Sequence, residues 1–361
     1  MNGYDVVVVG GGIGGLTVVA LLSARGVNTC LLERQSQVGG CIGRVEFSGY
    51  DFEPGDGFYT SFGPGGIYER LFAQLPVDIP SVSLMSSPYI VRRVDGGDTS
   101  IAGDELYSIA GGPASVAERL AESIKLSGGK VRLDTPVLRL AYDESGRAIG
   151  VDLLSGERVF AKNAIVSNLT IWDTYGKLVG LNRTPPEIKK QLNSLRGSGV
   201  YVIYAVMEEA AVARLPAVRM RVEDSAGQFT MAVADSVAPD GKRPVTFTTD
   251  TEVDSWFTYQ SSEEDYDEWD QEALAEFWKR VHEALPELGG DVEIIETANP
   301  RTYYDQTRRK LGMVRGIEGQ PIQSYETTLS NLFIVGDTMS AAARMDSVVE
   351  SALLLADRIT R

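Results

Sequence analysis

Runs of apolar residues separated by glycines give the first part of the chain a regular pattern. Residues 4–9 (YDVVVV) form an apolar run of the kind found in buried parallel strands. Apolar side chains then recur at helical spacing through residues 14–25, and residues 28–33 (NTCLLE) contain a second apolar run. This order of strand, helix and strand predicts a βαβ unit and a parallel sheet in an α/β fold.

Later segments predict helices with one apolar face and short strands. Helices are expected at residues 114–127, 271–285 and 347–361, and strands at residues 45–47, 130–133, 137–141, 148–153, 158–160, 164–167, 200–207, 229–234, 244–249 and 331–336. Residues 49–66, rich in glycine, proline and tyrosine, are expected to form a loop. The acidic residues 261–270 are expected to precede a helix whose charged face is exposed to solvent. The strands after residue 200 are joined by polar segments without a repeat, which favours a second, antiparallel sheet.

The composition limits the classes of partner. With 361 residues, 43% of them hydrophobic, the chain can bury one large core or two smaller ones, and two intertwined domains are expected. Acidic residues outnumber basic ones by 50 to 34, so the surface should repel nucleic acid and anionic lipid headgroups. The N-terminus lacks a signal-peptide pattern, and no apolar stretch approaches the roughly 20 residues that span a bilayer. We therefore expect a cytoplasmic protein with no nucleic-acid partner and no integral membrane segment.

Cysteine and histidine are too scarce for several kinds of site. The two cysteines, Cys30 and Cys41, are expected to be free thiols, because Cys30 falls in a buried strand and a reducing compartment disfavours disulfides. The single histidine, His282, is expected on the solvent side or flank of an amphipathic helix. With one histidine and no CxxC pair, neither a zinc site nor a Ser-His-Asp triad is expected.

The most informative motif is the glycine cluster that follows the first strand. Gly10, Gly12 and Gly15 complete a G-x-G-x-x-G pattern, with Ile13 and Gly14 between them, and a predicted helix begins at the same place. In such a loop the glycines allow a tight turn, a close approach to a pyrophosphate and close packing of helix on strand.

An acidic residue at the end of the second strand strengthens this interpretation. Glu33 lies near the spacing of roughly 20 residues expected for a carboxylate that accepts hydrogen bonds from ribose hydroxyls. A merely structural glycine turn would leave Glu33 unexplained. The sequence therefore predicts a dinucleotide site, although this motif alone does not distinguish FAD from NAD.

Further motifs resemble the phytoene desaturase and flavin amine oxidase superfamily. They lie in order along nearly the whole chain: Leu32-Glu33-Arg34, Gly39-Gly40, residues 49–55 (GYDFEPG), Gly111-Gly112, residues 128–133 (GGKVRL), Val166-Ser167-Asn168 and residues 331–337 (NLFIVGD). The resemblance implies a Rossmann-type, glutathione reductase-like FAD-binding domain with a smaller α+β substrate domain that contains the antiparallel sheet. FAD, rather than NAD, is then the expected cofactor.

The positions of these motifs also imply domain boundaries. Flavin motifs occur before, between and after two stretches that lack them. We therefore expect a discontinuous FAD-binding domain of residues 1–77, 111–172 and 299–361. Residues 78–110 and 173–298 would form the substrate-binding domain.

The resemblance assigns roles to matching positions. Asp337 would hydrogen-bond the ribitol or pyrophosphate, with a helix or turn cap as its alternative role, and Val137 would meet the adenine through its backbone. Backbone N–H groups near Met345 and Asp346 would face the pyrimidine edge of the flavin, where a helix N-terminus stabilises negative charge. Three further cofactor contacts are expected at Arg34, Gly40 and Gly336.

Two departures from the family pattern affect the prediction. Where the family often has arginine after the Gly-Gly pair, this chain has Cys41, and Arg44 is the candidate for the missing role. Cys41 beside a flavin could be redox-active, but an inert small residue is favoured, because neither lysine nor histidine is near it in sequence. The chain is also shorter than a typical phytoene desaturase and lacks a long apolar docking segment, which disfavours a long carotenoid.

The expected activity is oxidation, desaturation or isomerisation of a mostly apolar small molecule by hydride transfer to flavin. The pocket candidates are Phe58, Tyr59, Tyr303 and Lys310, the last in a turn that reads more like a solvated basic segment. Amine oxidation is the alternative reaction, and a nonenzymatic FAD-binding partner or escort is the alternative class. The cysteine that attaches flavin covalently in some members of the family has no counterpart in the C-terminal half, so the resemblance implies noncovalent FAD.

Overall fold

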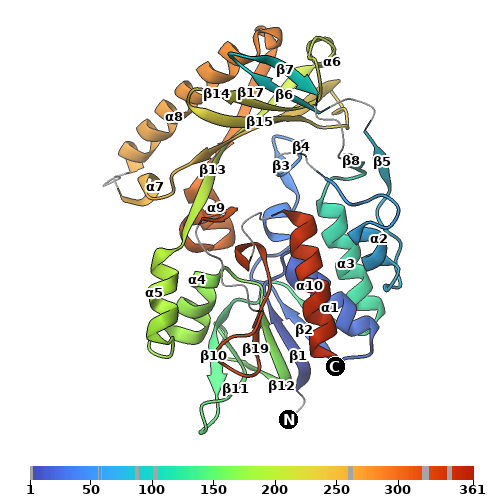
Figure 1. Ribbon diagram of the computed structural model, residues 1–361, viewed down its shortest axis with the longest axis vertical. Helices are drawn as coiled ribbons and strands as arrows, with labels where there is room; N and C mark the ends of the chain where they lie inside the picture. Colours follow the sequence, from blue (N-terminus) through green and yellow to red (C-terminus); the bar gives the residue numbers. More distant parts are fainter. Residues whose placement is uncertain are drawn as a thin grey trace.

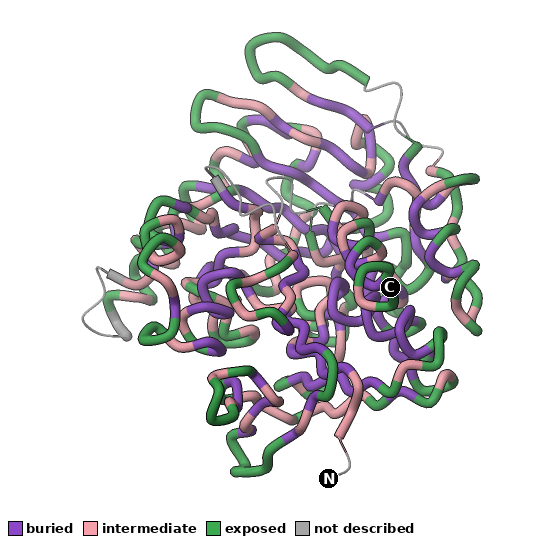
Figure 2. Tube along the Cα trace, turned by 60° about the horizontal axis from the view of Figure 1, so that its bottom comes forward, coloured by how far each residue is buried: buried purple, intermediate pink, exposed green. Residues whose placement is uncertain are grey.

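A computed structural model shows two large sheets with helices packed on them (Figure 1). It describes residues 3–55, 57, 59–85, 89–100, 105–258, 263–318, 325–339 and 344–361. Buried residues run through the strands of both sheets, whereas the outer loops are exposed (Figure 2).

The first sheet is the predicted parallel sheet. Its parallel strands follow one another in the order β19 (Leu332–Ile334), β12 (Arg158–Ser167), β1 (Tyr4–Val9), β2 (Thr29–Leu32) and β9 (Lys130–Arg132). An antiparallel pair, β10 (Val137–Tyr142) and β11 (Ala148–Leu153), extends the sheet beside the first half of β12. The α/β, Rossmann-type prediction is confirmed.

Helices cover one face of this sheet. Successive valines of β1 point to opposite faces, and each face has its own hydrophobic core. Val6 and Val8 contact the cluster that contains α1 (Ile13–Ala24), α3 (Ala114–Leu126) and α10 (Met345–Ile359). Helix α1 packs between α10 and α3 on this face of the sheet (Figure 1). Nearly every residue of α1 is buried, which explains why it has no polar stripe.

The opposite face of the sheet is covered by the segment that follows β12. It comprises α4 (Ile171–Asp173), a π-helical turn η2 (Thr174–Gly180) and α5 (Pro186–Ser194), whose apolar side chains pack with Val7 and Val9 of β1. Residues 173–195 therefore contact the first sheet, although the sequence suggested a boundary at residue 173. The division into two domains stays a prediction.

The second sheet carries the predicted antiparallel strands. Its order is β17 (Val292–Ala298), β13 (Arg196–Glu208), β16 (Lys242–Thr251), β15 (Gly227–Val233), β14 (Arg219–Asp224), β6 (Ile90–Arg93) and β7 (Gly97–Ser100), with β18 (Arg315–Glu318) also paired to β13. Only β14 and β6 among these neighbours run parallel in the described residues. Helix α8 (Glu263–Ala284) lies across one face of the sheet (Figure 1).

Shorter elements connect these layers. They are η1 (Gly40–Ile42), β3 (Val45–Phe47), β4 (Tyr50–Phe52), α2 (Ile67–Phe72), β5 (Val82–Leu84), β8 (Tyr107–Ile109), α6 (Glu209–Val212), α7 (Ser255–Thr258), η3 (Pro286–Leu288), α9 (Pro300–Thr307), η4 (Lys310–Gly312) and η5 (Asp337–Met339). Among the helices of the described ranges, none is both long and apolar enough to cross a membrane.

Three expectations about local structure were wrong. Residues 49–66 are not all loop, because β4 pairs with β3 there. The two strands expected at residues 158–160 and 164–167 form one strand, β12. The polar residues between them are exposed, at the point where β12 stops pairing with β11 and continues beside β1. The acidic residues from 263 to 270 belong to α8, because glutamate favours helix and negative charge is stabilised near a helix N-terminus.

Candidate cofactor and substrate site

The glycine loop lies between β1 and α1, as the motif predicts. Gly10 has a φ of 103°, which favours glycine, and a Cβ on Gly15 would lie 2.2 Å from the carbonyl oxygen of Gly10. The loop therefore tolerates no side chain at Gly15. Gly10, Gly12, Ile13 and Gly14 line one end of a large cavity, so the backbone is open to a ligand there.

Glu33 directly follows β2, and its carboxylate lies beside this loop. Its Oε2 accepts a hydrogen bond from the Gly11 N–H at 2.6 Å, and its Oε1 accepts one from the Gln35 N–H at 2.8 Å. The residue is only 8% exposed, yet it lines the cavity. A carboxylate has about four acceptor positions, so two remain for hydroxyl groups of a ligand.

Asn168 lies in one of the family-like motifs, but the sequence did not predict it as a cofactor-site residue. It follows β12, and a Cβ on Gly12 or Gly14 would lie 2.7 Å from its side-chain amide. With the amide oriented to match its neighbours, its oxygen accepts from the Gly12 N–H and its nitrogen donates to the Val335 carbonyl, both at 3.2 Å. Asn168 therefore joins the glycine loop to the end of β19.

The other N-terminal candidates divide into those that line the cavity and one that does not. Arg34, Gly40 and Val137 line it, and Gly39, beside Gly40, packs directly on the glycine loop. The Arg44 side chain instead forms ion pairs, with Asp51 at 3.4 Å among them, and does not line the cavity. The structure thus gives no support for Arg44 as a replacement for the arginine of the family pattern.

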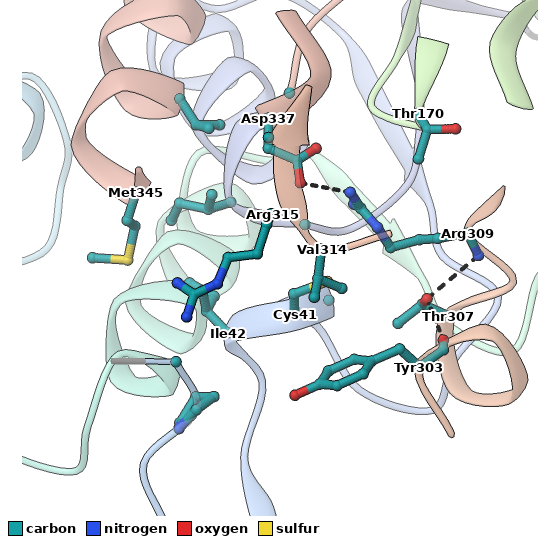
Figure 3. Close-up of a pocket in the computed structure, with 18 of the residues that line it drawn as sticks. Cys41, Ile42, Thr170, Tyr303, Thr307, Arg309, Val314, Arg315, Asp337 and Met345 are labelled. Atoms are coloured by element: carbon teal, nitrogen blue, oxygen red, sulfur yellow. Dashed lines mark hydrogen bonds and ion pairs between the residues drawn. The ribbon is translucent and has the colours of Figure 1, made fainter. Parts of the chain in front are cut away.

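Near β19, the cavity wall contains an ion pair that the sequence did not predict. Asp337 accepts a hydrogen bond from Arg309 at 2.6 Å (Figure 3). Arg309 also donates to the Met313 carbonyl at 2.7 Å. Burial acts to lower the pKa of Arg309, but the charge of Asp337 raises it above the ordinary value. Gly336, just before Asp337, also lines the cavity.

The N-terminus of α10 is the third wall of the same space. Met345 and Asp346 line the cavity, and Asp346 accepts a hydrogen bond from Thr60 at 2.9 Å. Burial acts to raise the pKa of Asp346, but this hydrogen bond and the Arg344 guanidinium hold it below its usual value. The backbone at this end of α10 therefore presents the positive end of a helix dipole to the cavity.

These walls enclose one continuous cavity of about 980 Å³. It runs from the glycine loop to the second sheet, where it is lined by residues of β13 to β16. Such a volume is at the upper end of the range for ligand pockets.

The predicted pocket residues do not all reach this cavity. Tyr59 and Tyr303 line it, and burial raises the pKa of the Tyr303 hydroxyl well above its ordinary value. Lys310 is exposed and does not line the cavity, while its backbone N–H donates to Asp173 at 2.9 Å. Phe58 lies outside the described residues. The position of Lys310 therefore does not support it as a pocket residue.

Both cysteines are free, as predicted. Cys41 lines the cavity near Asp337 and Arg309 (Figure 3). Burial raises the pKa of its thiol, although the Arg309 guanidinium acts to lower it. The neutral thiol is thus favoured, which agrees with an inert role.

Two family models match the chain. The model of the NAD(P)-binding Rossmann-like domain matches residues 8–75, and that of the flavin-containing amine oxidoreductases matches residues 69–360. This chain belongs to the flavin-containing amine oxidoreductase family. Membership of this family agrees with FAD as the cofactor.

Two of the relatives with an assigned activity are named for prolycopene and for a carotenoid. The chain is 25% identical over 271 residues to a prolycopene isomerase of Daucus carota, covering 69% of this chain and 43% of that protein. It is 35% identical over 107 residues to a carotenoid 3,4-desaturase of Haloarcula japonica, covering 29% of this chain and 21% of the relative. The chain thus spans less than half the length of either relative.

Solved structures agree with the fold. An oxidoreductase from Methanosarcina mazei superimposes with a TM-score of 0.69 at 16% identity, covering 98% of this chain and 99% of that one. Putrescine oxidase bound to putrescine superimposes with a TM-score of 0.68 at 13% identity, and both chains are covered completely.

The residues of the cavity fit FAD. The glycine loop leaves backbone accessible at the N-terminus of α1, where a pyrophosphate would be stabilised. Glu33 retains acceptor capacity for ribose hydroxyls, and Asp337 lies farther along the same cavity. Both ends of the predicted cofactor site therefore open on one space.

Proposed function

We propose that the protein oxidises, desaturates or isomerises a mostly apolar small molecule held between its two sheets. The observation that carries this proposal is the continuity of the cavity. The same space that contains the glycine loop and Asp337 extends to Val200 and Val202 on β13 of the second sheet. A molecule on those residues would lie in the same enclosure as the cofactor.

The protein's own part is to bind, orient and exclude water. Tyr59 and Tyr303 supply aromatic surface, and Val314 and Ile317 add aliphatic surface to the cavity wall. When bound, the flavin supplies the acceptor for a hydride from the substrate. The N-terminus of α10 favours negative charge at its end of the cavity.

The relatives named for prolycopene and a carotenoid support an apolar substrate. Amine oxidation is the second candidate, because the family model that matches residues 69–360 is that of amine oxidoreductases. We also propose that residues 78–110 and 173–298 form the substrate domain. Support comes from the second sheet, to which β6, β7 and β13 to β17 all belong.

Anaerobic flavin bleaching tests the proposal. The purified holoenzyme is mixed with a panel of unsaturated isoprenoids, apolar alcohols and carboxylic acids, and primary and secondary amines. Bleaching by an apolar compound supports the proposal. Bleaching by amines alone would replace it with amine oxidation. A flavin that no compound in a broad panel reduces, together with no isomerised product from any unsaturated compound, would contradict both.

A further inference from the structure

The two faces of the second sheet differ in polarity where β14, β15 and β16 lie side by side. One face carries apolar residues, among them Met220, Met231 and Phe247, and packs in the cluster beneath α8. Because successive side chains in a strand point to opposite faces, the residues between them face the other way. On that face, Arg221, Thr230 and Thr248 line the cavity.

The strand register places these three polar residues in one row. Arg221 of β14 is paired with Thr230 of β15, and Thr230 is paired with Thr248 of β16. Thr248 is in turn paired with the apolar Val202 of β13. We name Arg221, Thr230 and Thr248 the polar row.

The polar row has hydrogen-bonding capacity that the protein does not use. Thr248 is only 3% exposed, and its buried Oγ1 has no hydrogen-bond partner in the described residues. The buried Nε of Arg221 also makes no hydrogen bond, although it lies 3.4 Å from the Glu223 carboxylate in an ion pair. A buried polar atom without a partner costs stability, so such atoms commonly mark a site for a ligand or water.

Neighbouring polar residues on the same face have partners within the protein, although the buried Nε of Arg219 makes no hydrogen bond. Arg219 donates to the Glu53 carboxylate at 2.7 Å, and Thr246 donates to the Glu53 carbonyl at 3.3 Å. The loop that contains Glu53 thus supplies partners for Arg219 and Thr246. The polar row, one step along the strands, faces the cavity instead.

We propose that the polar row binds a carboxylate of the substrate, so that the substrate is an apolar molecule with one acidic end. This inference rests on the proposed function and specifies its substrate class. A guanidinium stays charged at any physiological pH, and together with hydroxyl donors it matches a carboxylate. Val202, next in the same row, begins the apolar surface for the rest of the molecule.

Two carboxylates of the second sheet bear on the charge of this subsite. Glu223 is shared between Arg221 and Arg93, whose Nε lies 3.0 Å from it, so it neutralises Arg221 only in part. Asp250, on the cavity wall, is held by Arg315 at 3.1 Å. Removing the charge of Glu223 should therefore strengthen the binding of an anion.

Ligand titration of the holoenzyme tests the inference. Saturated fatty acids from octanoate to palmitate and the matching alcohols are titrated while the flavin absorbance spectrum is recorded. We expect acids to bind at least about tenfold more tightly than alcohols, because hydrogen bonds to a charged group exceed neutral ones. Arg221→Gln should abolish this preference, Thr248→Val should reduce it, and Glu223→Gln should increase it.

Arg139→Gln is the matched control, because Arg139 is an exposed arginine of the first sheet paired with Asp152. It should leave the preference unchanged. Equal affinity for acids and alcohols, an absence of acid binding, or equal effects of Arg221→Gln and Arg139→Gln would overturn the inference. In those cases a holoenzyme that a neutral apolar compound still bleaches keeps the proposed function, whereas a protein without flavin fails the proposed function itself.

Discussion

Replacing Glu33 by glutamine tests the nucleotide end of the site with a nearly isosteric change. Both carboxylate oxygens of Glu33 accept backbone hydrogen bonds, from Gly11 at 2.6 Å and from Gln35 at 2.8 Å. A glutamine has only one acceptor oxygen at its end. Whichever way the amide is turned, its NH₂ group must face one of these two N–H donors.

The expected loss follows from this conflict. One buried backbone donor is left without a partner, which costs about 1–3 kcal/mol of folding stability. Charge-assisted hydrogen bonds to ribose hydroxyls are lost as well, so FAD affinity should fall by about 2–4 kcal/mol, or roughly 30- to 1,000-fold. Glu33→Arg should weaken FAD binding at least as much, because it places a cation at the same point.

Calorimetric titration of the apoprotein with FAD measures the affinity, and urea unfolding of the apoprotein measures stability separately. Glu157→Gln is the control, because Glu157 is a half-exposed carboxylate that pairs with Arg132 on β9 at 2.7 Å. It should leave FAD affinity unchanged. A folded Glu33→Gln variant with wild-type FAD affinity would refute the role of Glu33 in holding the cofactor.

Four further outcomes are expected. Gly15→Ala should prevent FAD retention and lower the melting temperature, because its Cβ would lie 2.2 Å from the Gly10 carbonyl oxygen; a stable yellow variant would contradict the loop geometry. Asp337→Ala should destabilise the protein by about 1–3 kcal/mol in urea unfolding, since the largely buried Arg309 loses its ion-pair partner, and Asp337→Ala combined with Arg309→Met should recover part of the loss. Cys41→Ser should retain FAD. In the unmodified chain, iodoacetamide should label Cys41 slowly at neutral pH and faster as the pH rises, because the raised pKa of the thiol keeps it protonated at neutral pH. Rapid labelling at neutral pH would mean a reactive thiolate. NADH or NADPH should not bleach the oxidised flavin at turnover rates in anaerobic stopped-flow mixing, because the sequence offers one glycine motif in the required context.

Local patterns were sufficient to predict the nucleotide half of the fold. The apolar run of β1, the glycine loop and Glu33 lie close together in sequence and follow the periods of strand and helix. For the same reason β19 and α10 were anticipated near the C-terminus. The cavity brings together the predicted positions in these segments, including Glu33, Asp337 and Met345.

Side-chain partners were beyond the reach of local patterns. Arg309 belongs to a basic turn that suggested a solvated surface, but the fold of the segment around η4 brings its guanidinium to Asp337. Arg44 was chosen for its proximity to the Gly-Gly pair and Lys310 as a lysine of the C-terminal third, but their side chains lie outside the cavity wall. Residue type and spacing do not determine which way such a side chain turns.

The polar row needed information that no single segment contains. Arg221, Thr230 and Thr248 lie on three strands, and only the register between those strands aligns them. β14 itself was not predicted, because its charged residues weaken the apolar signal of a strand. Its alternate residues Met220 and Val222 are nonetheless buried beneath α8.

Identification of the cofactor released on denaturation tests the central claim most directly. The purified protein is denatured in acid, the precipitate is removed, and the supernatant is separated chromatographically and quantified against protein. We predict that FAD is released in an amount equimolar with the protein and that the precipitate is colourless, as noncovalent binding requires. Release of NAD without flavin, or flavin that remains attached to the precipitated chain, would contradict the account.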